Sequence, residues 1–225
     1  MSAERGNAAT RSLLLAGVIG AFGFLAVALA AGAVRPDYSA LHVPVSLLSR
    51  GPGGWVQVAN FVVTGVLMVA CAVGLRRGLH AGPGDRWGPY LVATYGVGLA
   101  GAGVFPADPS FAYPPGAALG PATSPSVPGM MHEIASVLVF GALSAACFVF
   151  ARRFGARPGD RRWRTYCIAT GLAVPAFLAG AFFAWTRGTP LNFGGVLQRM
   201  SIAAGWGWIA LLALRIRRET PATSP

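Results

Sequence analysis

The 225-residue chain is 54% hydrophobic and only 11% charged, a balance far outside that of a water-soluble globular protein. Its formal net charge of +11 comes from arginines in short segments between apolar stretches, so the charge does not indicate a nucleic-acid partner. The composition predicts an all-α integral membrane protein whose partner is membrane lipid.

Six apolar stretches follow one another, each near the roughly 20 residues that a helix needs to cross about 30 Å of hydrocarbon. The third is the shortest and the richest in glycine, so we expect it to pack closely against its neighbours. The fifth contains Pro175, where a kink is expected. In chain order the predicted spans are 12–34, 55–75, 88–104, 130–151, 165–185 and 196–214.

The predicted organisation is a cytoplasmic tail over residues 1–11, a six-helix transmembrane domain over 12–214 and a second cytoplasmic tail over 215–225. The first stretch also resembles a cleaved signal peptide, because Ala31-Gly32-Ala33 is similar to a cleavage site. Its apolar run is longer than the roughly 7 to 15 residues of a signal core, which favours a first span.

The arginines predict how the helices are oriented. Four of the 18 basic residues fall on one side of the membrane in this arrangement, and the remaining 14 fall on the other. Because positively charged loops stay in the cytoplasm, both termini are predicted to be cytoplasmic, in a multi-pass protein of the cell membrane. The four outer arginines are Arg35, Arg50, Arg187 and Arg199.

Polar residues that the topology does not require gather on the predicted outer side. They come from the first loop, the start of the second span, the end of the third and the start of the fourth. Histidine and carboxylate side chains supply both acid–base chemistry and metal ligands. The candidate catalytic residues are therefore His132, Asp108 and His42, and the same three are the candidate ligands of a divalent metal at the outer face.

The candidate binding residues are Asn60, Ser46, Glu133 and Arg199. Each has a structural alternative. A buried amide such as Asn60 often joins two helices, and Arg199 lies where an arginine extends toward the interface. His132 begins a helix and forms no HExxH zinc motif, because the position of the second histidine holds Ser136.

Several short motifs stand out along the chain, namely Gly54-Trp55-Val56-Gln57, Asn60-Phe61, Gly65, Gly103-Val104-Phe105-Pro106-Ala107-Asp108 and His132. Together they resemble the bacterial multi-pass membrane family called domain of unknown function 998. The resemblance extends from the first span to the sixth, and it implies a multi-pass topology. It also points to Asn60, Asp108 and His132, but implies no mechanism, since the family has no established activity.

Three functions follow from these observations. The first is binding of a lipid or small amphiphile by the outer polar cluster. The second is an intramembrane hydrolase or transferase acting on a lipid. His132 would be its base and Asp108 the carboxylate that orients it, or both would bind a metal together with His42. The third is a small-molecule transporter. The sequence does not fix whether the protein is an enzyme, nor its oligomeric state, and the convergence of the polar side chains decides between the first two.

Overall fold

The computed structural model describes residues 2–187 and 192–221, which form six α-helices and one short 3-10 helix with no strand among them. The prediction of an all-α architecture is confirmed. The helices are α1 Ser2–Val34, η1 Val45–Ser49, α2 Gly54–Gly78, α3 Trp87–Val104, α4 Val127–Gly155, α5 Arg161–Thr186 and α6 Gly194–Glu219. Helices α1 and α6 include parts of the two predicted tails.

Five of these helices, α1, α2, α4, α5 and α6, are long and apolar enough to cross a membrane. Helix α3 forms where the third span was predicted. It has 18 residues and is rich in glycine, and it is not among the five helices that are long and apolar enough. At about 1.5 Å per residue it is close to the thickness of the hydrocarbon core. The described chain is therefore a multi-helix membrane protein with five helices of spanning composition and a sixth, shorter one.

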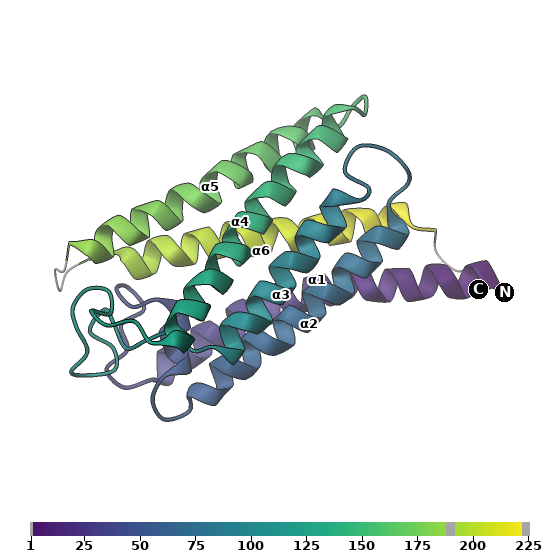
Figure 1. Ribbon diagram of the computed structural model, residues 1–225. Helices are drawn as coiled ribbons and strands as arrows, with labels where there is room; N and C mark the ends of the chain where they lie inside the picture. The colour runs from purple at the N-terminus through teal and green to yellow at the C-terminus, as the bar shows by residue number, and fades with distance from the viewer. Residues whose placement is uncertain (1, 188–191, 222–225) are drawn as a thin grey trace.

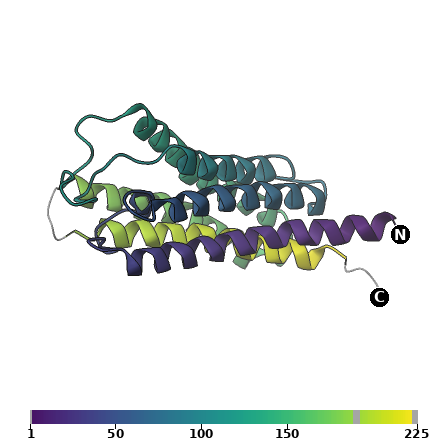
Figure 2. The same ribbon diagram turned by 90° about the horizontal axis from the view of Figure 1, so that it is seen from below.

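The helices form a closed bundle in chain order. Each helix packs on the next one along the chain, and α1 packs on α6 to complete the ring. Figures 1 and 2 show that α1 begins and α6 ends at the same end of the bundle, and that the long connections 35–53 and 105–126 lie at the opposite end. We call this opposite end the loop end.

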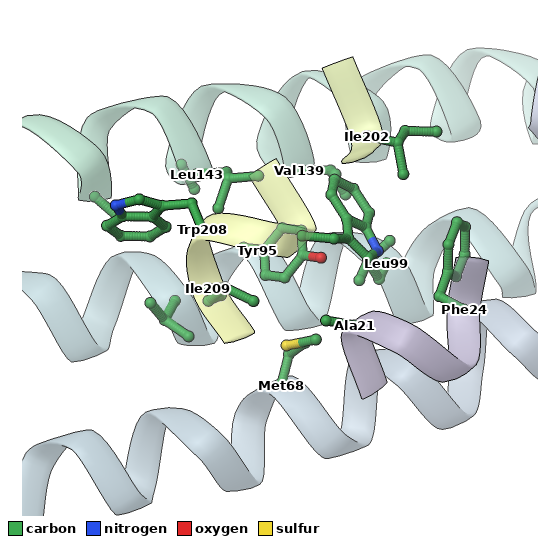
Figure 3. Close-up of a cluster of buried hydrophobic side chains, with 14 of the residues drawn as sticks. Ala21, Phe24, Met68, Tyr95, Leu99, Val139, Leu143, Ile202, Trp208 and Ile209 are labelled. Atoms are coloured by element: carbon green, nitrogen blue, oxygen red, sulfur yellow. The ribbon is translucent and has the colours of Figure 1, made fainter. Parts of the chain in front are cut away.

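The core of the bundle is apolar, and all six helices contribute buried side chains to it. Figure 3 shows core side chains of α1, α2, α3, α4 and α6 approaching one another. The most buried of them are at most 1% exposed, so they pack against other helices instead of lipid. They include Phe24 of α1, Met68 of α2, Tyr95 of α3, Leu143 of α4 and Ile209 of α6.

Helix α3 meets both of its neighbours through glycines. A Cβ atom on Gly65 of α2 would lie 2.5 Å from the carbonyl oxygen of Gly96, and one on Gly96 would lie 2.7 Å from the carbonyl oxygen of Gly65. On the other side, a Cβ on Gly98 would lie 3.0 Å from the carbonyl oxygen of Ala135 in α4. The close packing predicted for the third span is confirmed, because only glycine permits backbones to approach this closely.

The connection between α1 and α2 folds back onto the loop end of the bundle, and η1 is its buried part. Gln198 of α6 accepts a hydrogen bond from the backbone N–H of Val45, at 2.8 Å. Arg199 donates to the carbonyl oxygens of Val43, at 3.1 Å, and Gly195, and to the hydroxyl of Tyr38. Two consecutive residues of α6 therefore hold this connection in place, Gln198 through η1 and Arg199 through the residues before it.

Candidate binding site

A cavity of about 390 Å³ lies at the loop end, between α4, α5, η1 and the connection 105–126. Figure 1 shows α4 and α5 diverging from their short connection toward this end. The volume is within the usual range for small-molecule sites, roughly 300 to 1,000 Å³. Its polar lining residues are Ser46, Asp108, Ser110, His132, Glu133, Ser136 and Gln198, and its larger apolar ones are Leu47, Phe111, Val137, Phe140, Leu178, Phe182 and Trp185.

A second, inner chamber of about 40 Å³ lies deeper in the bundle. Trp206 is part of its wall, and the indole Nε1 of this residue is buried without a hydrogen-bond partner among the described residues. A chamber of this size has room for at least one water molecule. The chamber shares with the outer cavity the residues Ser46, His132, Ser136, Phe140 and Gln198, so the two spaces adjoin.

His132 lies on α4, and its side chain is 97% buried at the boundary between the two spaces, with 3% relative exposure. Its Nδ1 lies 2.8 Å from the carbonyl oxygen of Phe105 and 3.1 Å from that of Ala102. Carbonyl oxygens only accept hydrogen bonds, so Nδ1 carries the proton. In the neutral ring, Nε2 then presents a lone pair, and this atom has no hydrogen bond within the described ranges.

Asp108 lines the same cavity, but its carboxylate is bound to the start of α4. It accepts hydrogen bonds from the hydroxyl and the backbone N–H of Ser126, both at 2.7 Å, and lies 3.8 Å from Arg50. These hydrogen bonds, with the positive charge of Arg50, lower the pKa of Asp108. The Ser126 hydroxyl in turn accepts from the backbone N–H of Gly129 and caps the helix.

The other candidate residues separate into two groups. Ser46 and Glu133 line the cavity beside His132 and Asp108. His42 does not: its Nδ1 contacts the carbonyl oxygen of Asn192, and its own carbonyl accepts from Trp185 Nε1 at 2.6 Å. The structure thus does not gather His42 with the other two candidate metal ligands. Within residues 2–187 and 192–221, no group of three or more histidine, cysteine or acidic side chains is placed to hold a metal.

Asn60 and Arg199 have hydrogen bonds that join parts of the fold. Asn60 donates to the carbonyl oxygen of Phe24 in α1, at 3.1 Å, and to the Gln57 side chain, at 3.2 Å. Arg199 holds the connection between α1 and α2 through Val43 and Tyr38. Neither residue lines the cavity, so the structure does not bring either of them together with His132 and Asp108.

The enzyme hypothesis assigned His132 as the base and Asp108 as the group that orients it. In the structure, two backbone carbonyls orient His132, and Asp108 is engaged with Ser126. That the protein is a hydrolase, a transferase or a transporter stays a prediction from the sequence. The site residues that sequence reasoning missed are Gln198, Ser136, Ser110 and Phe111. Only the placement of Ser136 four residues after His132, on the same helix face, gave a signal.

A family model described as a protein of unknown function, DUF998, matches residues 18–215. The matched segment contains both cavities and most of every helix, from the middle of α1 to the last turn of α6. No curated protein and no solved structure matches the chain.

Proposed function

This chain belongs to the DUF998 family of proteins of unknown function, and we propose that it binds a lipid or small amphiphile in the cavity between α4, α5 and η1. The proposal rests on how polar and apolar groups are distributed over the cavity wall. Polar groups of His132, Gln198 and Ser136 lie toward the inner chamber, and the side chains of Val137, Leu178 and Phe182 line the side between α4 and α5.

An amphiphile fits such a division, because its head needs hydrogen-bond partners and its chain needs apolar surface. Two of the apolar lining residues are also exposed on the outside of the bundle, Val137 at 72% and Phe182 at 59%. In a membrane protein such side chains face lipid. The cavity therefore has an edge from which a molecule in the bilayer can enter between α4 and α5.

We place the cavity in the outer leaflet of the cell membrane, with six helices crossing and both termini cytoplasmic. Support comes from the start of α1 and the end of α6, which lie at one end of the bundle (Figure 1), and from the connection 156–160 at that same end. The arginine-rich segments that precede and follow this connection favour the cytoplasmic side for it.

The proposal is tested by filling the cavity. Ser136→Phe adds a ring to a residue that lines both spaces, whereas Leu138→Phe adds it on the outer surface of the same helix, where Leu138 is 43% exposed. The measurement is the amount of lipid or amphiphile that copurifies with each variant, read by native mass spectrometry after extensive detergent washing.

Wild type and Leu138→Phe are expected to retain the amphiphile, and Ser136→Phe to lose it. Because an added ring also strains a packed interior, size-exclusion chromatography and circular dichroism must show that Ser136→Phe is folded. If folded Ser136→Phe retained as much amphiphile as wild type, the cavity would not be the binding site.

A further inference from the structure

We infer that the head of the bound amphiphile is a primary ammonium group, an inference that rests on the binding function proposed above. It follows from the charged and unpaired groups that line the cavity. Three of its polar groups are acceptors without a free N–H: the carboxylates of Asp108 and Glu133 and the Nε2 atom of His132. The other polar lining residues, three serines and Gln198, are neutral and can both donate and accept, so they fit a head of either kind. Among the described residues, no arginine lines the cavity.

His132 sets the direction of the hydrogen bond. Because Nδ1 donates to the carbonyl oxygens of Ala102 and Phe105, the neutral ring offers a lone pair at Nε2. This atom belongs to a side chain that is 97% buried, and it has no partner among the described residues. A buried acceptor is stabilised by a donor, so the ligand atom that lies here carries an N–H or O–H.

The carboxylates set the charge. Asp108 is compensated by Ser126 and Arg50, whereas Glu133 is exposed at the cavity and has no ion pair or hydrogen bond within the described part of the chain. A cationic head would pair with the charge of Glu133, and an anionic head would be repelled by it. A neutral hydroxyl would satisfy His132 but would not pair with Glu133.

The rings of the wall favour a cation as well. Phe111 and Trp185 lie with their ring centroids 4.9 Å apart, and both line the cavity together with Phe140. Aromatic faces attract ammonium groups, most strongly where water is excluded. A quaternary ammonium would use these rings but has no N–H for His132, which is why the acceptors indicate a primary ammonium.

The test compares four probes with the same twelve-carbon chain: dodecylamine, dodecyltrimethylammonium, dodecanol and dodecyl sulfate. Each is titrated against the full-length protein in a neutral maltoside detergent, and binding is read as a shift of the thermal midpoint. Dodecylamine is expected to bind at least about tenfold more tightly than the other three, a difference of about 1.4 kcal/mol.

Glu133→Gln should weaken dodecylamine binding by about tenfold and leave dodecanol binding unchanged. Asp37→Asn is the matched control, because Asp37 is an exposed outer carboxylate that does not line the cavity, and its positive φ of 58° is tolerated by asparagine. Ser136→Phe reports binding of the amine to the micelle alone, since its cavity is filled.

The outcomes separate the two proposals. If none of the four probes shifts the wild-type midpoint, the amphiphile-binding function fails. If dodecanol, dodecyl sulfate or the quaternary amine binds as tightly as dodecylamine, or if Glu133→Gln behaves as Asp37→Asn does, the ammonium inference is overturned and the binding function stands. A second experiment distinguishes an aminolipid of the bilayer from a free alkylamine as the ligand. The protein is placed in nanodiscs of phosphatidylethanolamine and extracted again, and only an aminolipid ligand would remain bound to the extracted protein.

Discussion

The carboxylate of Asp108 lies against the α-carbon of Gly129, in the space that a Cβ atom at residue 129 would occupy. This contact joins the connection after α3 to the first turn of α4, where Ser126 caps the helix and binds Asp108. The end of α3 and the start of α4 together hold His132 at the cavity, so this junction determines the shape of the site.

Gly129→Ala should therefore destabilise the protein. The added methyl group would collide with Asp108 and push it from Ser126, at a cost typical of overpacking, about 1 to 3 kcal/mol. The thermal midpoint in detergent measures the effect. Gly141→Ala in the same helix is the control, because nothing lies within 4 Å of its Cβ position, and there alanine is expected to leave stability unchanged or raise it by up to about 1 kcal/mol. Equal midpoints for the two variants would contradict the described contact.

The stability of the protein should fall in acid through Asp108. The pKa of this carboxyl is lowered in the folded protein, so its contribution is complete above the ordinary carboxyl pKa of about 4 and is lost as pH falls through the lowered value. Asp108→Asn should lower the thermal midpoint at neutral pH and show a smaller decrease than wild type below about pH 4. Parallel pH profiles for wild type and Asp108→Asn would show that the contacts of Asp108 do not stabilise the fold.

The hydrogen bond between Gln198 and η1 should be needed for stability. Gln198→Met keeps the size of the side chain but leaves the buried N–H of Val45 without its acceptor, at a cost of about 1 to 3 kcal/mol. Gln198→Glu retains an acceptor oxygen and is expected to fall between the methionine variant and wild type. Hydrogen exchange at Val45 provides a local readout, which should become faster in the methionine variant. Unchanged exchange there would mean that other contacts hold η1.

Cysteine labelling tests the predicted topology and the crossing by α3. The native cysteines, Cys71, Cys147 and Cys167, are buried, so a single introduced cysteine is the accessible one. A membrane-impermeant maleimide should label Thr123→Cys in intact cells and label Ala81→Cys and Arg161→Cys only after lysis. All three positions are exposed.

Labelling of Ala81→Cys and Thr123→Cys from the same side would show that α3 does not cross. Labelling of Arg161→Cys from outside would reverse the orientation expected from the arginines.

The helices and their approximate limits could be predicted from the sequence, because the requirement behind them is local. A segment in hydrocarbon must satisfy its own backbone hydrogen bonds, so an apolar run of about 20 residues forms a helix whatever its neighbours are. The close packing of α3 could also be predicted from its own residues. A helix with glycines such as Gly96 and Gly98 has little side-chain bulk to separate it from its neighbours.

The site could be predicted only in part, because it depends on how each helix is rotated and on the path of the loops. Polar residues at the predicted outer ends of the helices were visible in the sequence. The same pattern fits both Asn60, which joins α1 to α2, and His132, which lines the cavity. Gln198 reaches the site because η1 folds back against α6, a contact between residues 153 positions apart in the chain. The sequence alone thus determined which segments are helices, since bilayer thickness and backbone hydrogen bonding act on each segment separately. The tertiary structure alone decided which polar side chains meet, since that depends on packing between segments distant in the chain.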